Sequence, residues 1–220
     1  MKSTNTDSIS TKVAKILLDS GAVFFRPKQP FKFDSGILSP VYVDNRRLIS
    51  LPQERRIITR QLVDLIKKRT GIPDVVAGVA TAGITHAAWI ANKLNIPMVY
   101  VRPKPKDHGR ENQVEGIIKR GQKVVVIEDM VSTGGSSVSA VRALRKLGAK
   151  VNYEVAIYTH QMQESTKNFK ENKIKFFSLT DLMTVAEIAQ KRNYFQEEQL
   201  AAIVNWARDP KNWGRKMGFE

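Results

Sequence analysis

Cysteine is absent from the sequence, so neither disulfide bonds nor thiolate metal ligands are available to the chain. This composition is typical of a reducing compartment and predicts a cytoplasmic protein. No uninterrupted apolar run is long enough to cross a bilayer, and residues 1–11 lack the apolar centre of a signal peptide. We therefore expect a soluble protein with no membrane partner.

Histidine is scarce as well, with three in 220 residues, and no set of His, Asp and Glu has the spacing of a metal site. No Ser, His and Asp order indicates a catalytic nucleophile. His86 lies one turn into an expected helix, where a packed or capping role is the simpler interpretation. The sequence therefore indicates neither a metal site made of side chains nor covalent catalysis.

Acidic residues are far fewer than basic ones, and 21 Asp and Glu against 36 Lys and Arg give a formal net charge of +15. Three explanations are open: nucleic-acid binding, polyanionic small substrates, or solvated basic helix faces. The basic residues are spread along the chain, with short clusters at 55–56, 67–69 and 119–120. No basic tail, no basic run with interleaved aromatics and no nucleic-acid motif is present, so we expect no nucleic-acid partner.

The chain length predicts one domain, because 220 residues suffice for one well-buried core and are too few for two. From Asp74 onward strand and helix patterns alternate, which predicts an α/β fold with a parallel sheet flanked by helices on both faces. The β-rich opening does not follow this alternation and is expected to form a small cap. We divide the single domain 1–220 into a helix and cap (1–50), an α/β core (51–180) and C-terminal helices (181–220).

The expected elements follow from apolar periodicity and from Gly, Pro and capping signals. Core strands are predicted at residues 75–79, 98–101, 124–127, 152–158 and 174–179, and cap strands at 22–25, 31–33 and 40–44. Helices are predicted between Ser8 and Gly21, from Pro52 onward, and at 84–94, 137–147, 165–171, 182–191 and 197–208.

The central feature is the stretch 123–137, where an apolar strand is followed by Glu128 and Asp129 and then by a turn of Ser, Thr and Gly. Glycines let backbone N–H groups approach an anion, hydroxyls donate hydrogen bonds, and a helix start adds partial positive charge. The carboxylates can hold ribose hydroxyls or a Mg²⁺ ion bridged to pyrophosphate. The alternative is an ordinary strand-to-helix turn with capping hydroxyls.

This stretch is neither a Walker loop nor a dinucleotide-binding glycine motif. Residues 128–136 resemble the phosphoribosyl-pyrophosphate signature of type I phosphoribosyltransferases, and that resemblance implies the fold of this family. It also implies that phosphoribosyl pyrophosphate (PRPP) is bound by Glu128, Asp129, Met130, Val131, Ser132, Thr133, Gly134, Gly135 and Ser136.

A long polar loop between Val101 and Ile117 is strongly cationic, and it is either a solvated excursion or a lid over an anion. Its Arg-x-x-x-Lys-x-His-Gly pattern, with Arg102, Lys106 and His108, is similar to the mobile catalytic loop of orotate phosphoribosyltransferases. The resemblance implies that these three residues bind PRPP. It also implies a homodimer in which loop 102–115 reaches the neighbouring subunit's site. Pro103 departs from the family, since many members carry Lys directly after the Arg.

Two further segments resemble the same family, each with a departure. Residues 31–46 are similar to its N-terminal signature and place Tyr42 near the base, although Asp34 stands where many members have Lys. The turn 78–83 is similar to the pyrophosphate turn, but Ala82 replaces a common Lys. His160 lies near where some relatives have a base-contacting Arg. We interpret the departures as marks of another branch of the family.

The resemblance implies transfer of ribose-5-phosphate from PRPP to orotate, giving orotidine 5′-monophosphate and pyrophosphate in pyrimidine (UMP) biosynthesis. Mg²⁺ is the implied cofactor, carried by pyrophosphate and not by a protein metal site. Lys106, His108 and Asp129 are the implied catalytic residues, and Ser132 and Tyr42 the implied orotate contacts.

Two alternatives stay open at this point. One is a purine or uracil phosphoribosyltransferase that uses the same phosphate site. The other is a ligand-binding regulator that contacts nucleic acid, for which the charge of +15 is the only support.

Overall fold

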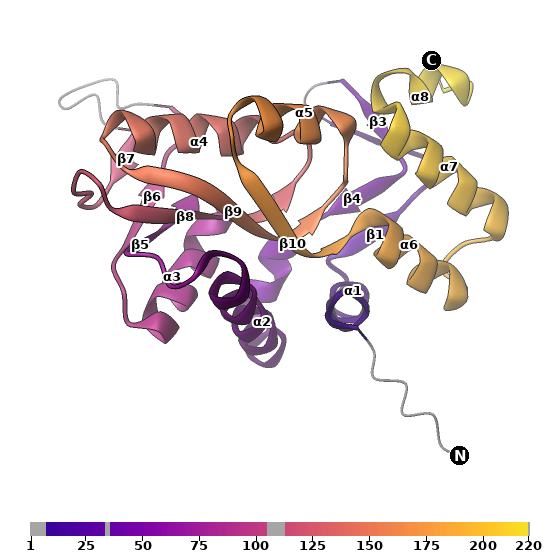
Figure 1. The fold of residues 1–220 in the computed structure, drawn as a ribbon. Coiled ribbons are helices and arrows are strands. Elements are labelled where there is room, and N and C mark those ends of the chain that lie inside the picture. Colours follow the sequence, from indigo (N-terminus) through magenta and orange to yellow (C-terminus); the bar gives the residue numbers. More distant parts are fainter. Residues whose placement is uncertain (1–7, 34–35, 105–112, 220) are drawn as a thin grey trace.

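The computed structural model describes residues 8–33, 36–104 and 113–219 (Figure 1). Its centre is a six-stranded sheet in the order β10-β9-β8-β5-β6-β7. The strands are β5 (Val75–Val79), β6 (Met98–Val101), β7 (Val114–Glu115), β8 (Lys123–Val131), β9 (Lys150–Thr159) and β10 (Lys175–Asp181). All neighbours are parallel except β7, which runs antiparallel to β6. The predicted α/β class is confirmed.

The chain changes direction across the sheet between β5 and β8. From β5 it moves outward to β6, and it then crosses back to β8 before continuing to β9 and β10. In open parallel sheets, ligands bind outside the carboxyl ends of the strands at such a switch point. The topology therefore directs attention to the turns that follow β5 and β8.

Helices cover both faces of the sheet (Figure 1). Helices α2 (Pro52–Thr70) and α3 (Ala82–Leu94) lie on one face, while α4 (Gly135–Lys146) and α5 (Gln163–Glu171) lie on the other. Two buried apolar clusters result, one on each face. Strand β5 is buried along its whole length, as its unbroken apolar sequence predicts.

The N-terminal part packs against the C-terminal helices. Helix α1 (Ile9–Asp19) is capped by Ser8 and contacts β10 and α6 (Leu182–Lys191). Two short antiparallel strand pairs follow it. They are β1 (Val23–Phe25) with β4 (Val41–Val43), and β2 (Phe31–Lys32) with β3 (Leu38–Ser39). These pairs form the expected cap. Helices α7 (Glu197–Arg208) and α8 (Pro210–Lys216) end the chain. The indole Nε1 of Trp206 donates to the carbonyl of Leu38 at 2.9 Å and so ties α7 to the cap.

Several predicted boundaries are confirmed, and others are wrong. Strands 75–79 and 98–101 and helix 182–191 have the predicted bounds. Strand β8 is longer than predicted, so Glu128 and Asp129 lie inside it and do not follow it. Strands β3 and β7, helix α8 and the 3-10 helix η1 (Asn45–Ser50) were not expected. Of the described helices, none has the length and apolar character that a bilayer crossing needs.

Candidate functional site

The turns after β5 and β8 lie side by side because two glycines allow α3 to pack closely on the sheet. A Cβ on Gly83 would lie 2.5 Å from the carbonyl oxygen of Ile127 and 3.4 Å from the Cα of Glu128. A Cβ on Gly78 would lie 2.8 Å from the Cα of Ile84. The start of α3 therefore contacts β8 next to the acidic pair, and the Cα of Gly83 has room there for a hydrogen atom but not for a side chain.

The turn after β8 leads directly into α4. Gly134 adopts φ +77° as the residue that precedes the helix, and no described side chain caps the helix start. The first N–H groups of α4 are therefore open to an anion. Helix α5 holds this turn in place, because Asn168 Nδ2 donates a hydrogen bond to the carbonyl of Thr133 at 2.8 Å. A Cβ on Gly134 would lie 3.2 Å from the Phe169 ring.

The acidic pair is nearly enclosed, with Glu128 6% and Asp129 9% exposed. Burial raises the pKa of Glu128 well above its usual value, and the neighbouring Asp129 and Glu154 add to the effect. Burial also raises the pKa of Asp129, against the opposing effect of hydrogen bonds and of the Arg46 charge. A positive charge developing beside these two carboxyl groups would favour their ionised forms.

The cap reaches this pair through η1. Asn45 is fully buried, and its Nδ2 donates to the backbone carbonyl of Asp129 at 2.8 Å. Arg46 follows Asn45, and the positive charge of Arg46 partly offsets the rise that burial causes in the pKa of Asp129. The guanidinium of Arg46 also contacts the Tyr42 hydroxyl at 3.4 Å and the Asp44 carboxylate at 2.6 Å. Sequence analysis did not single out Asn45 or Arg46. The three consecutive polar residues 44–46 at the end of a cap strand could have indicated them.

Tyr42 and Ser132, the expected base contacts, have different surroundings. Tyr42 is half-buried in β4 beside the rings of Phe31 and Phe24, with centroid distances of 5.5 and 6.4 Å. Ser132 directly follows β8, and its hydroxyl lies 3.5 Å from the sulfur of Met162. Both residues stay candidates for contact with a substrate.

The expected anion lid begins beside the turn after β5. The amide of Ala80 donates to the carbonyl of Val101 at 2.9 Å, which places Arg102 next to that turn. The backbone of Arg102 pairs with Gln113, and its guanidinium lies 3.8 Å from the Glu115 carboxylate. Lys106 and His108 lie outside the described residues, so their assignments stay predictions.

Two histidines are buried away from solvent. His86 packs edge-on against Trp89, with ring centroids 5.4 Å apart, and burial lowers its pKa to about 4. His160 is 1% exposed and its Nδ1 lies 3.0 Å from the Tyr158 hydroxyl, while its ring meets Trp206 edge-on. Burial lowers its pKa to about 3. Both histidines are neutral core residues, and the substrate contact suggested for His160 stays a prediction.

Glu154 is a buried carboxyl group that sequence analysis missed. It lies on β9, fully buried, and its Oε1 accepts a hydrogen bond from the Ser137 hydroxyl in the first turn of α4. Its Oε2 has no partner among the described residues. Burial raises the pKa of Glu154 to about 8. The signal in the sequence was a charged residue directly before the apolar run 155–157.

Replacing Glu154 by glutamine will change how the free energy of unfolding depends on pH. The unfolded carboxyl group ionises near pH 4.5 and the folded one near 8, so the natural chain loses stability as pH rises between these values. Glutamine keeps an acceptor for Ser137 and does not ionise. The free energy of unfolding of the variant minus that of the natural chain should therefore increase by a few kcal/mol from pH 5 to pH 8, measured by urea unfolding. An unchanged difference across that range would contradict the assignment.

Comparison with known proteins gives matches over almost the whole chain. A model of the phosphoribosyl transferase domain matches residues 47–191. The orotate phosphoribosyltransferase of Listeria innocua is 47% identical over 208 residues, which cover 94% of this chain and 100% of that protein.

Solved structures give matches of the same kind. The structure of orotate phosphoribosyltransferase from Aeropyrum pernix superposes with a TM-score of 0.73 at 30% identity, covering 84% of this chain and 99% of that one. Leishmania donovani UMP synthase gives a TM-score of 0.76 at 29% identity, covering 90% of this chain and 42% of that one. The matched domain includes both turns and the acidic pair.

Proposed function

The chain belongs to the orotate phosphoribosyltransferase family, and from this membership we propose that it transfers ribose-5-phosphate from PRPP to orotate, releasing pyrophosphate. The observation that carries the proposal is the buried pair Glu128 and Asp129, which adjoins an uncapped helix start at the switch point of the sheet. The reaction belongs to pyrimidine (UMP) biosynthesis. We place it in the cytoplasm, which the cysteine-free sequence suits.

The chemistry requires no protein nucleophile. As pyrophosphate leaves C1 of the ribose, the ring develops positive charge, which the carboxylates of Glu128 and Asp129 stabilise while they hold the ribose hydroxyls. The turn after β8 and the N–H groups at the start of α4 bind the 5-phosphate. Ser132 and Tyr42 position orotate. Catalysis then consists of positioning and electrostatic stabilisation.

Pyrophosphate is bound by the turn after β5. The turn after β5 binds it through backbone N–H groups other than that of Ala80, which is taken by Val101; this turn directly precedes α3 and adjoins the acidic pair. Arg102 approaches from the end of β6. We assign Lys106 and His108 to the same leaving group on the family resemblance, with Lys106 neutralising its charge and His108 next to the charge that develops on it.

The direct test mixes the purified chain with PRPP, Mg²⁺ and orotate, and follows loss of orotate together with release of pyrophosphate. We expect one pyrophosphate for each orotate consumed, and no consumption of adenine, hypoxanthine or uracil. If another base is consumed and orotate is not, the phosphate site stands and the base assignment is wrong. If no base is consumed, the proposed reaction is wrong.

Magnesium is expected to arrive with PRPP. Mg²⁺ prefers hard oxygen ligands, and the phosphate oxygens of pyrophosphate supply them. Chelation with EDTA should therefore abolish turnover, and added Mg²⁺ should restore it. Mg²⁺ with PRPP should raise the melting temperature, whereas Mg²⁺ alone should not. A rise with Mg²⁺ alone would indicate a metal site made of protein side chains.

We further propose that the protein is a homodimer in which each subunit lends loop 102–115 to its neighbour's site. Mixing inactive Lys106→Ala chains with inactive Asp129→Asn chains should then restore turnover, because a mixed dimer holds one site with neither substitution. With random assortment, about a quarter of all sites are intact. A control mixture of Asp129→Asn with Glu128→Gln chains should stay inactive, since both residues belong to one subunit's site. Mixed dimers without recovered turnover would contradict loop sharing.

A further inference from the structure

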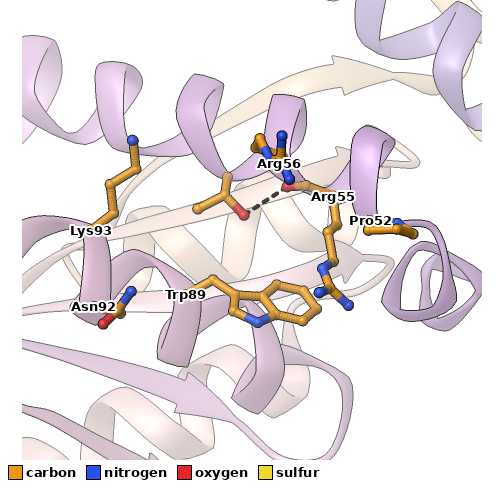
Figure 2. Close-up of a pocket in the computed structure, with 7 residues that line it drawn as sticks. Pro52, Arg55, Arg56, Trp89, Asn92 and Lys93 are labelled. Atoms are coloured by element: carbon orange, nitrogen blue, oxygen red, sulfur yellow. Dashed lines mark hydrogen bonds between the residues drawn. The ribbon is translucent and has the colours of Figure 1, made fainter.

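A pocket of about 440 Å³ lies between α2 and α3, and neither the proposed reaction nor its substrates account for it (Figure 2). Its lining residues come from both helices: Pro52, Arg55, Arg56, Thr59, Trp89, Asn92 and Lys93. Trp89 lies about two turns further along α3 than Gly83, which adjoins the acidic pair. A volume of this size is typical of sites for small molecules.

The pocket is cationic. Arg55, Arg56 and Lys93 line it, and no carboxylate is among its lining residues within the described ranges. Figure 2 shows Lys93 rising from α3 at one end of the pocket, with Arg55 and Arg56 from α2 toward the other. Three positive charges gathered in one concave surface attract a multiply charged anion.

The second feature is an aromatic surface held in place beside these charges. The Arg55 guanidinium lies over the Trp89 ring, 5.0 Å from the centroid, and its Nη1 donates to the Ile49 carbonyl at 2.7 Å. His86 packs against Trp89 as well, with the two ring planes at 82° and their centroids 5.4 Å apart. Two planar groups are thus ordered before any ligand binds, which reduces the entropy lost on binding.

Of the two remaining polar side chains in the lining, one already has a hydrogen-bond partner within the protein and the other is exposed to solvent. The Thr59 hydroxyl donates to the backbone carbonyl of Arg55 at 2.7 Å, so it holds α2 together and is not needed by a ligand. Asn92 is exposed at the rim, where its amide offers one donor and one acceptor group. A planar heterocycle with hydrogen-bonding edges matches this combination better than a simple anion does.

We propose that this pocket binds a nucleoside phosphate. The base stacks on the Arg55 guanidinium, which itself lies over the Trp89 ring. Asn92 contacts the polar edge of the base, and Arg56 and Lys93 bind the phosphates. The site is additional to the substrate site, and the two are occupied independently. The proposal of this second site therefore does not depend on which base the protein uses as its substrate.

The test titrates the full-length protein with ATP, which is neither a substrate nor a product of the proposed reaction, at saturating PRPP and Mg²⁺. Binding is followed by calorimetry and by quenching of tryptophan fluorescence. The chain has three tryptophans, and Trp206 and Trp213 are 0% and 2% exposed, so quenching reports on Trp89. We expect saturable quenching, at least tenfold weaker binding of inorganic tripolyphosphate, and loss of the quenching in Trp89→Phe with binding retained.

Arg56→Glu and Arg60→Glu make a matched pair on α2. Both residues are exposed and the charge change is the same, but only Arg56 lines the pocket. Arg56→Glu should weaken ATP binding at least tenfold, and Arg60→Glu should leave it within twofold. Turnover of PRPP should stay at the natural level in both variants.

Three results would overturn the site. ATP could fail to bind at millimolar concentration both with and without PRPP. It could also bind only when PRPP is left out, which would place it in the substrate site. The two arginine variants could weaken binding equally, which would indicate general attraction to a basic surface. Failure of ATP to bind together with a changed oligomeric mass in Arg56→Glu would mean that a second copy of the chain covers the pocket.

Discussion

Replacing Asp129 by asparagine will lower kcat/KM for phosphoribosyl transfer by about 100-fold or more. The two side chains have nearly the same shape, and the backbone at this position is held independently by Asn45, which donates to the Asp129 carbonyl. The substitution therefore removes one negative charge and little else. That charge acts only when the ribose ring becomes cationic, so kcat should fall more than KM rises.

Stability should not fall together with activity. Burial raises the pKa of Asp129, so the folded state disfavours its ionised form. At neutral pH the unfolded carboxyl group is ionised without this penalty, and asparagine removes the difference. We expect an unchanged or higher free energy of unfolding at pH 7 to 8. A large loss of activity without loss of stability distinguishes an electrostatic role from a structural one.

The control for this experiment is Asp64→Asn, because Asp64 is an exposed carboxylate on α2 outside the proposed site. It should keep turnover within twofold. Steady-state kinetics with orotate and PRPP, combined with urea unfolding of both variants, provides all the needed measurements. If Asp129→Asn retains turnover within a factor of a few, the proposed role of the acidic pair is wrong.

The layout of the core was predictable because its signals are local. Strands β5 and β6 are short apolar runs between Pro, Gly and polar residues, and helix α6 combines apolar periodicity with Asp181 as its N-cap. Those elements have the predicted bounds. The glycine-rich turn was likewise found from its sequence, since Gly134 adopts a positive φ that glycine accommodates without strain.

The end of β8 was not predictable from the apolar pattern. Glu128 and Asp129 mark the end of an apolar run, yet the strand continues through them to Val131. Their burial comes from groups distant in the sequence, including Asn45 of η1 and the packing of Gly83. A sequence pattern reports which residues favour burial, but not which polar residues the rest of the chain will cover.

The shortest elements and the supporting residues depend on tertiary contacts for the same reason. Strands β3 and β7 have two residues each, too few for any periodicity, and they exist because β2 and β6 supply partners. Arg46 and Glu154 affect the acidic pair only through distances set by the fold. Lys106 and His108, by contrast, came from the cationic loop pattern together with the family resemblance, and they stay predictions.

Replacing Gly83 by alanine will destabilise the protein by about 2 to 4 kcal/mol and remove most of its activity. The added Cβ would lie 2.5 Å from the Ile127 carbonyl oxygen, a distance that requires α3 or β8 to move. Both are regular elements in the buried core, so neither can yield by rotating a side chain. The displacement would separate the turn after β5 from the acidic pair.

Gly135→Ala provides the matched comparison, since Gly135 also lies in the first turn of a helix that follows a core strand. Its added Cβ would meet only the Thr133 hydroxyl, at 3.8 Å, so its stability should be equal to or slightly above that of the natural chain. Urea unfolding of both variants separates the cost of close packing from the general effect of adding a methyl group. Equal stability of the two variants would show that α3 does not need this close approach. The proposed adjacency of the pyrophosphate turn and the ribose-binding pair would then lose its structural basis.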